Sequence, residues 1–283
     1  MKEQNVPITA LTAYDYPTGL AIENTHSNSD IDGIDIALIG DSLAFTCLGL
    51  DSTSSLTLDE MIHHSKAVVR AAKTPFVVSD MPFGTTSISK EDTIRSAIKL
   101  VKNSGTDSVK IEGSKKSADI IEGVVNAGVP VIGHIGLLPQ RATQSSGFRV
   151  QGKTPKSALS IVEDALALQK AGAFAILIEA VPSKLGEYIT NLLKIPTIGI
   201  GAGNLTSGQV LVQNDMLGIF EDFKPKFVRN FTNVNQHINF GLQSYIQSVR
   251  DRSFPSNNES YTVDQKNWED FENLIKNYNF KDN

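Results

Sequence analysis

Short apolar runs alternate with longer amphipathic segments along most of this chain. Eight of the runs are rich in Val and Ile without strict polar alternation, which is typical of parallel strands covered on both faces. The predicted strands are Ile8–Ala13, Asp35–Gly40, Phe76–Ser79, Ser108–Ile111, Val131–His134, Ala175–Ile178, Thr197–Ile200 and Val210–Gln213. Pro75, Pro130 and Pro196 mark the entry to the third, fifth and seventh strands. The pattern therefore predicts an α/β protein.

The segments between the runs have the apolar spacing of helices. Thr57 precedes one of them and Glu60 follows it at capping-box spacing. Ser89 and Asp92 stand in the same relation at the start of the next segment. The predicted helices are Leu58–Ala72, Lys90–Asn103, Lys116–Asn126, Lys156–Lys170 and Lys184–Leu193. The polar stretch Asn24–Asp32 interrupts this alternation and predicts a loop.

Several helix–strand junctions resemble one another. Each places a glycine at the expected helix C-cap, followed by a few residues and then a strand. The aligned glycines are Gly33, Gly105 and Gly172, after which Gly40, Glu112 and Glu179 fall at the same position. This repeat of one βα unit favours a (β/α)8 TIM barrel over a chain of unlike domains.

The segment after about Arg229 is more polar and does not continue the repeat. It contains one predicted helix, Val234–Arg250, and then a break at Phe254–Ser260. An aromatic-containing segment follows, with Trp268, Phe271 and Tyr278. We expect a single barrel domain over residues 1–283, with 229–283 as a C-terminal helical appendage packed on the barrel or on a neighbouring subunit.

Composition narrows the classes of function. The 283 residues carry 26 Lys and Arg against 31 Asp and Glu, a net charge of −5. The chain has no basic stripe of the kind that would indicate nucleic-acid binding. No apolar run reaches the roughly 18 residues that a membrane span needs. Cys47 is the only cysteine, which excludes an internal disulfide and a cysteine metal cage. The first residues, MKEQNVPIT, resemble neither a signal peptide nor an Arg-rich leader, so we do not expect secretion.

Acidic residues stand at the ends of the predicted strands. Asp41, Asp80, Glu112 and Glu179 each close an apolar run, and Asp215 follows a weaker run. Because burying an unpaired carboxylate costs on the order of several kcal/mol or makes it neutral, this repetition indicates a shared site at the C-terminal face of the barrel. The first three can hold one Mg²⁺ through hard oxygen ligands. The alternative is that each acid is a salt-bridged structural charge.

Two basic residues accompany these acids. Lys110 lies two residues before Glu112 and so faces the same side of its strand, where it can neutralise a substrate carboxylate. His134 ends the fifth strand, and we expect it to serve the site rather than only to fill the core. The run GIGAG, Gly199–Gly203, is either an anion cradle or a tight loop, and it is weak as a dinucleotide signature.

Longer motifs resemble the ketopantoate hydroxymethyltransferase family, in the family's order, from about residue 9 to about residue 255. They are TAYDYPT (12–18), IGDSLAFTCLGLDST (39–53), SDMPFG (79–84), VKIEG (109–113), GHIGLLPQ (133–140), SGFRVQGK (146–153), LIEAVP (177–182), IPTIGIGAG (195–203), GQVLVQNDMLG (208–218) and FKPKFV (223–228). Ala180 departs from the family's usual Cys, and Leu138 from its usual Thr. The tail beyond Phe254 resembles the extension of the family's eukaryotic branch.

This resemblance implies a reaction. 3-Methyl-2-oxobutanoate would receive a hydroxymethyl group from 5,10-methylenetetrahydrofolate, giving 2-dehydropantoate and tetrahydrofolate in the first step of pantothenate biosynthesis. The resemblance also implies a barrel of the phosphoenolpyruvate/pyruvate type and a homo-oligomer, expected to be a decamer. It implies a mitochondrial location as in the eukaryotic branch, with the cytoplasm as the alternative.

The same resemblance implies a role for each strand-end residue. It places Mg²⁺ at Asp41, Asp80 and Glu112, substrate contacts at Ser42 and Lys110, and the catalytic proton acceptor at Glu179. We also expect Asp41, Asp80 and His134, at their strand ends, to contact the substrate. These roles are chemically consistent. A 2-oxo acid can chelate Mg²⁺ through its keto and carboxylate oxygens, and the ion would stabilise the enolate left when Glu179 takes the C3 proton.

Two other readings of the chain compete with this one. A Mg²⁺-dependent carbon–carbon lyase or mutase, similar to isocitrate lyase or phosphoenolpyruvate mutase, would share the barrel and the metal-bound oxo acid. Many such enzymes carry a catalytic Cys in a mobile loop, and no cysteine is so placed here. A non-catalytic scaffold barrel predicts a damaged site, whereas every expected site residue is present.

Overall fold

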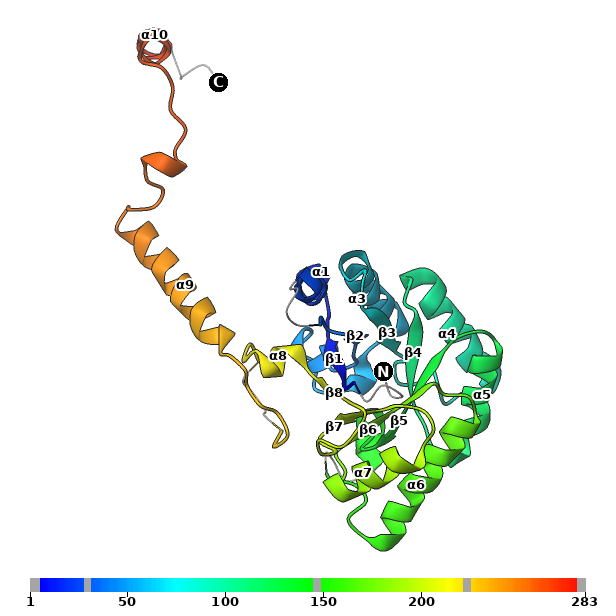
Figure 1. Ribbon diagram of the computed structural model, residues 1–283. Coiled ribbons are helices and arrows are strands. Elements are labelled where there is room, and N and C mark those ends of the chain that lie inside the picture. The colour runs from blue at the N-terminus through cyan, green and yellow to red at the C-terminus, as the bar shows by residue number, and fades with distance from the viewer. Residues whose placement is uncertain (1–5, 28–31, 145–148, 221–224, 279–283) are drawn as a thin grey trace. The chain divides into compact units, whose positions relative to one another are not determined.

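Eight parallel strands close into a barrel in the computed structural model, which describes residues 6–27, 32–144, 149–220 and 225–278 (Figure 1). Each strand pairs with the next one along the chain, and the eighth pairs with the first. The predicted (β/α)8 barrel is therefore confirmed. The chain divides into two units, Met1–Thr232 and Asn233–Asn283, and the barrel belongs to the first.

The strands match their predicted positions to within two residues at either end. Their bounds are β1 Ile8–Thr12, β2 Ile36–Ile39, β3 Phe76–Asp80, β4 Ser108–Glu112, β5 Val131–Gly136, β6 Ala175–Glu179, β7 Thr197–Ile200 and β8 Gly208–Leu211. Carboxylates predicted to follow β3, β4 and β6 are thus the last residues of those strands.

Helices surround the strands, and α3 to α7 ring the barrel in Figure 1. The helices of this unit are α1 Tyr16–Asn24, α2 Leu43–Thr46, α3 Leu58–Ala71, α4 Lys90–Ser104, α5 Ala118–Asn126, α6 Pro155–Lys170, α7 Ser183–Leu192 and α8 Gln213–Met216. The predicted capping box of α3 is confirmed, because Thr57 Oγ1 accepts the Glu60 N–H and Glu60 accepts the Thr57 N–H. Ser89 caps α4 through the Asp92 N–H as predicted.

Helix α1 was missing from the sequence prediction. Its composition argued against a helix, because Gly19 lowers helix propensity. Asp15 caps the helix by accepting the Thr18 N–H, and Pro17 stands in the first turn, where its missing N–H costs nothing. A Cβ at Gly19 would lie 3.1 Å from the Ala71 Cβ of α3. The glycine therefore serves close helix packing rather than a turn.

The predicted loop and its glycine differ from expectation in part. Residues 25–27 form a 3₁₀ turn, Thr25–Ser27, after α1, and residues 28–31 of the predicted loop lie outside the described part of the chain. Gly105 and Gly172 take the left-handed φ values of +82° and +94° expected after a helix, but Gly33 does not. The predicted βα repeat is therefore confirmed for the turns before β4 and β6. The turn before β2, which contains Gly33, is of a different kind.

Two apolar layers hold the barrel. One lies between strands and helices and includes Ile39, Val109, Ile111 and Ile178. The other fills the barrel interior and consists of Ile8, Ala10, Ile36, Leu38, Val78, Ile132, Ala175, Leu177, Ile198 and Val210. Because side chains alternate along a strand, the residues two positions beyond the interior layer also face inward. This alternation brings the strand-end charges into the mouth of the barrel.

The second unit consists of helix α9 Val234–Arg250, a 3₁₀ turn Asn257–Glu259 and helix α10 Gln265–Lys276. Helix α9 has the predicted bounds, whereas α10 was not predicted as a helix. Neither helix has a buried residue. Among the described residues of the whole chain, no helix is both long and apolar enough to span a membrane.

Candidate active site

The predicted charged residues meet at the C-terminal ends of neighbouring strands. Strand register pairs Asp80 with Lys110 and Glu112 with His134, so each acid lies beside a basic side chain from the adjacent strand. All four are buried. Glu179 ends the next strand, and its register partner on β5 is Gly136. The registers of three consecutive strand pairs therefore assemble the site.

Lys110 and Asp80 form a buried ion pair with an Nζ–Oδ2 distance of 3.0 Å. Burial raises the pKa of Asp80 to about 7, partly offset by Lys110 and increased by Asp41. Burial alone would lower the pKa of Lys110, but the charges of Asp80, Asp41 and Glu112 hold it above its usual range. Asp80 Oδ2 also accepts the Asp41 N–H at 2.9 Å. Lys110 is thus a permanent cation among carboxyl groups.

His134 lies between Lys110 and Glu179. Lys110 Nζ is 3.3 Å from Nδ1, and because an ammonium can only donate, Nδ1 accepts this hydrogen bond. Burial, together with Lys110, keeps the pKa of His134 well below its usual range, so the ring is neutral. A neutral ring with Nδ1 as acceptor carries its proton on Nε2, which lies 3.2 Å from Glu179 Oε2 but makes no well-aligned hydrogen bond there. His134 therefore directs its Nε2–H group towards Glu179.

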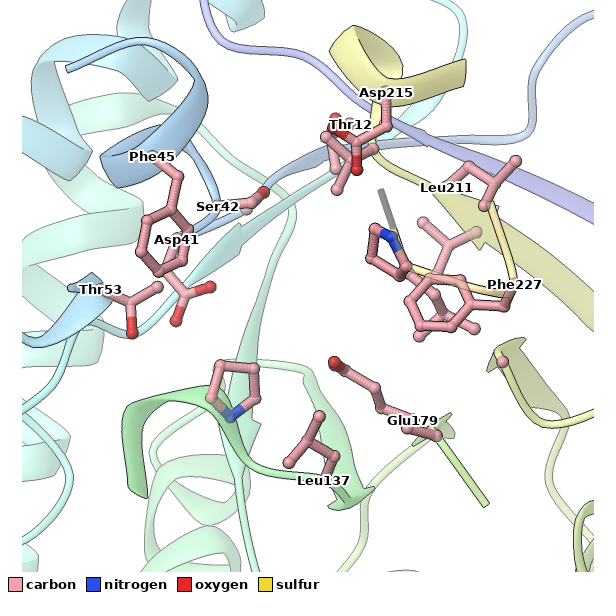
Figure 2. Close-up of a pocket in the computed structure, with 18 of the residues that line it drawn as sticks. Thr12, Asp41, Ser42, Phe45, Thr53, Leu137, Glu179, Leu211, Asp215 and Phe227 are labelled. Atoms are coloured by element: carbon pink, nitrogen blue, oxygen red, sulfur yellow. The ribbon is translucent and has the colours of Figure 1, made fainter. Parts of the chain in front are cut away.

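Glu179 points into the cavity from the wall opposite Asp41 and Ser42 (Figure 2). Burial raises its pKa to about 8, with Lys110 opposing the shift and Asp41 adding to it. The next residue, Ala180, has a left-handed φ of +48°, which is unusual for a residue with a Cβ. The chain therefore turns sharply just after this carboxyl group.

Gln140, to which no sequence pattern assigns a role, links two of the predicted metal ligands. Its Nε2 donates to Asp41 Oδ2 and to the carbonyl of Met81, each at 2.9 Å, and its backbone N–H donates to Glu112 Oε1 at 2.9 Å. The side chain is buried. Gln140 thus fixes one oxygen of each carboxylate, although it lies in a short 3₁₀ helix, Pro139–Gln144, where no periodic pattern marks it.

The predicted metal ligands are gathered at one end of the barrel but do not form a finished cage. Among the described residues, no three His, Cys, Asp or Glu side chains converge as a preformed metal cluster. Asp41 and Asp80 line the cavity, whereas Glu112 is not among its lining residues. Asp80 Oδ1 and Glu112 Oε2 are buried without a hydrogen-bond partner. These unpartnered hard oxygens suit a divalent cation, so the donor chemistry fits the group that the sequence predicted.

The cavity at the site is about 1150 Å³ in volume. Its polar lining includes Asp41, Ser42, Asp80, Lys110, Glu179 and Asp215. Asp215, left without a role by the sequence, is partly buried, and burial raises its pKa to about 6. From GIGAG, Gly201 and Gly203 line the cavity with positive φ. A Cβ at Gly201 would lie 2.6 Å from the Phe227 ring, which favours the tight-loop interpretation of this run.

Comparison with known proteins places the chain beside one family. Residues 1–257 match the model of the ketopantoate hydroxymethyltransferase family. The chain is 48% identical over 266 residues to the 3-methyl-2-oxobutanoate hydroxymethyltransferase of Heliobacterium modesticaldum, covering 94% of each. It is 45% identical over 271 residues to the enzyme of that name from Emericella nidulans, covering 95% of this chain and 76% of the relative.

Solved structures share the barrel at much lower identity. A phosphoenolpyruvate phosphomutase from Streptomyces platensis subsp. rosaceus aligns with a TM-score of 0.58 and 15% identity, over 95% of this chain and 92% of that one. A 2,3-dimethylmalate lyase of the phosphoenolpyruvate mutase/isocitrate lyase superfamily aligns with a TM-score of 0.56 and 14% identity, over 97% and 93%. These likenesses establish the barrel type and add no argument for carbon–carbon bond cleavage by this chain.

Proposed function

Because this chain belongs to the ketopantoate hydroxymethyltransferase family, we propose that it transfers a hydroxymethyl group to 3-methyl-2-oxobutanoate, giving 2-dehydropantoate. The one-carbon donor in this proposal is 5,10-methylenetetrahydrofolate, which leaves as tetrahydrofolate. The observation that carries the proposal is the position of Glu179, a mostly buried carboxyl group that faces a cavity also lined by Asp41, Asp80 and Lys110.

The roles of the side chains follow from their positions. Lys110 binds the carboxylate of the oxo acid, because it is a buried cation at the cavity wall. Glu179 removes the C3 proton, and its pKa of about 8 lies close to neutral working pH, where a general base is efficient. The neutral His134 lies beside Glu179 with its Nε2 proton and orients that carboxylate and the bound acid.

Asp41, Asp80 and Glu112 are the proposed residues for Mg²⁺, with Gln140 holding two of them in place. When bound, the ion supplies Lewis-acid stabilisation of negative charge on the oxo acid. Asp41, Ser42 and Asp80 also line the wall against which the oxo acid would lie. A cavity of about 1150 Å³ exceeds the needs of one five-carbon acid and leaves room for part of a second substrate.

A direct assay tests this function. Purified protein would be mixed with Mg²⁺, 3-methyl-2-oxobutanoate and 5,10-methylenetetrahydrofolate, and 2-dehydropantoate would be followed by mass spectrometry. We expect product only when all three are present. Absence of product from correctly folded protein would reject the proposal, and cleavage of a 2-methylmalate-type acid by the same preparation would favour the lyase alternative.

Assembly and location are further parts of the proposal. We propose a homo-oligomer, by resemblance a decamer, in which residues 229–283 form an appendage to the barrel domain. The exposed apolar side chains Ile238, Leu242, Tyr245, Ile246 and Val249 along α9 support a surface for self-association. The proposed location is mitochondrial, with the cytoplasm as the alternative. Imaging of the tagged chain in its own cells distinguishes the two.

A further inference from the structure

The hydroxyl groups of Thr12, Tyr14 and Ser42 are hydrogen-bonded in series at the cavity end of the barrel. Tyr14 is 1% exposed, and its hydroxyl lies 2.8 Å from Thr12 Oγ1 and 2.9 Å from Ser42 Oγ. Gln213 donates its backbone N–H to Thr12 Oγ1 at 2.8 Å. Three of the four residues follow or end strands that are neighbours in the barrel, since Thr12 ends β1, Ser42 follows β2 and Gln213 follows β8.

The direction of the proton donors along this series is determined at one end. A backbone N–H can only donate, so Thr12 Oγ1 accepts from Gln213. Thr12 Oγ1 in turn donates its own proton to the Tyr14 hydroxyl. Tyr14 then has its single proton available for Ser42 Oγ. Burial raises the pKa of Tyr14 above its usual range, so this proton is retained at any working pH. Either hydroxyl of the Tyr14–Ser42 pair can donate, and when Tyr14 is the donor the proton of Ser42 remains for a group in the cavity.

The surroundings of Ser42 match this arrangement. Ser42 and Thr12 both line the cavity, and Figure 2 shows the Ser42 side chain on its rim near Asp41. A Cβ at Gly40 would lie 2.9 Å from Ser42 Oγ, so the glycine leaves room for the hydroxyl. Thr46 Oγ1 donates to the Ser42 carbonyl at 3.2 Å and holds the backbone of this turn.

We propose that Tyr14 is a positioning residue, which occupies the acceptor side of Ser42 and so presents the Ser42 hydroxyl to the cavity as a donor to an anionic oxygen of the substrate. A hydroxyl that already accepts one hydrogen bond is polarised and donates more strongly. Identification of that oxygen as part of a 2-oxo acid rests on the proposed function. The series of hydrogen bonds from Gln213 through Thr12 and Tyr14 to Ser42, called the relay below, does not depend on that function.

The test is a double-mutant cycle with Tyr14→Phe and Ser42→Ala, read as the Kd of 3-methyl-2-oxobutanoate in the presence of Mg²⁺ by calorimetry. A hydrogen bond to a charged group corresponds to roughly tenfold or more in affinity, so each single variant should weaken binding by about that factor. If Tyr14 acts through Ser42, the double variant binds no more weakly than Ser42→Ala. If the two factors of affinity loss multiply in the double variant, the proposal is overturned.

Two further variants separate the relay from general damage. Thr12→Ser keeps the hydroxyl and should bind as the parent protein does, whereas Thr12→Val interrupts the relay and should resemble Tyr14→Phe. Ser65→Ala is the matched control, because Ser65 Oγ and Ser79 Oγ form a buried hydroxyl pair at 2.9 Å that does not line the cavity. It should leave the Kd unchanged. An equal loss in Ser65→Ala would also overturn the proposal.

A crystal structure of Tyr14→Phe tests the relay without any substrate. The proposal expects Ser42 Oγ to leave its position or to occupy several rotamers once its donor is gone, and an unchanged single rotamer would refute it. If the parent protein failed to bind the oxo acid, the proposed function would fall, and the position of Ser42 in this crystal structure would still decide the relay.

Discussion

Lys110 Nζ lies 3.0 Å from Asp80 Oδ2, and both side chains are almost completely removed from water. Asp41 and Glu112 add to the field that keeps Lys110 charged. A single buried cation therefore compensates several carboxyl groups before any ligand binds. Because desolvated charges interact strongly, this pair affects the stability of the barrel as well as the site.

Replacement of Lys110 by Met should destabilise the folded chain. Removing one partner of a buried ion pair leaves the other uncompensated, which costs about 3–5 kcal/mol in the free energy of unfolding. The loss should shrink near pH 5, where Asp80, with a pKa of about 7 even beside Lys110, is protonated. Urea unfolding at neutral pH and at pH 5 measures this loss in the free energy of unfolding. The control is Lys115→Met, whose 3.3 Å pair with Glu163 is largely exposed and should contribute less than about 1 kcal/mol.

Glu179→Gln should separate binding from proton abstraction. The amide has nearly the same shape but cannot accept the C3 proton, so Mg²⁺ and 3-methyl-2-oxobutanoate should still bind while exchange of that proton in deuterated water stops. Proton NMR of the oxo acid follows the exchange. Glu187→Gln on α7, which lies outside the cavity lining, should exchange normally. Exchange at the parental rate in Glu179→Gln would assign the base elsewhere.

The metal-free protein should lose stability as the pH rises. Burial raises the pKa of Asp80 from its ordinary value of 3.8 to about 7, and the pKa values of Glu112 and Glu179 from 4.5 to about 8. Between the ordinary and the raised values the folded chain holds more protons than the unfolded chain, so the free energy of unfolding falls with increasing pH. His134 acts in the opposite direction at the acid end, because its pKa is lowered. Urea unfolding in EDTA from pH 5 to 8.5 measures the slope.

Mg²⁺ should reverse that loss. A divalent cation binds ionised carboxylates, so the rise in Tm on adding Mg²⁺ should be larger at pH 8 than at pH 6. Calorimetry at matched ionic strength, with Na⁺ replacing Mg²⁺, provides the comparison. A Tm shift that is equal at the two pH values would place the ion away from these carboxyl groups.

Gln140→Leu should weaken Mg²⁺ binding without unfolding the barrel. The residue orients Asp41 through its side chain, and losing such a partner typically lowers metal affinity by about 10–100-fold. The bond from its backbone N–H to Glu112 remains. Mn²⁺ titration by electron paramagnetic resonance gives the affinity. Gln169→Leu is the control, because the Gln169 side chain also ties down a loop, accepting the N–H groups of Lys194 and Ile195, but does so before β7, at the opposite end of the barrel.

The apolar face of α9 should control assembly. Leu242 and Val249 are 56% and 45% exposed, and placing Glu at both positions should lower the molar mass measured by light scattering if this face joins subunits. Gln243→Glu, on an exposed polar position of the same helix, should not change the mass. An unchanged mass in the double variant would leave α9 outside the interface.

The barrel and its charged residues were predictable because both follow strand periodicity. Val- and Ile-rich runs fixed the strands, and the acid at each strand end pointed to a common face, where the structure indeed brings Asp80, Lys110 and Glu112 together. Helix α1 was missed because Gly19 serves packing against α3, which only the folded structure reveals.

Gln140 and Tyr14 were not predictable as parts of the site. Gln140 bonds to Asp41 at a separation of 99 residues, and Tyr14 bonds to Ser42 at a separation of 28. Tyr14 lies in a loop and Gln140 in a short 3₁₀ helix, where amide and hydroxyl side chains follow no repeat. The strand periodicity therefore identified the charges of the site, while the neutral groups that orient them became visible only in three dimensions.

The strand registers have a consequence for folding fidelity. In β4, Lys110 and Glu112 face the interior while Val109 and Ile111 face the helices. A slip of β4 by one residue would exchange these faces and press both charges into the apolar layer beneath α4 and α5. Misaligned barrels would therefore carry uncompensated buried charges, and their free energy would be much higher than that of the native state. The residues that serve chemistry in the finished protein thus also discriminate against wrong strand pairings while the barrel closes.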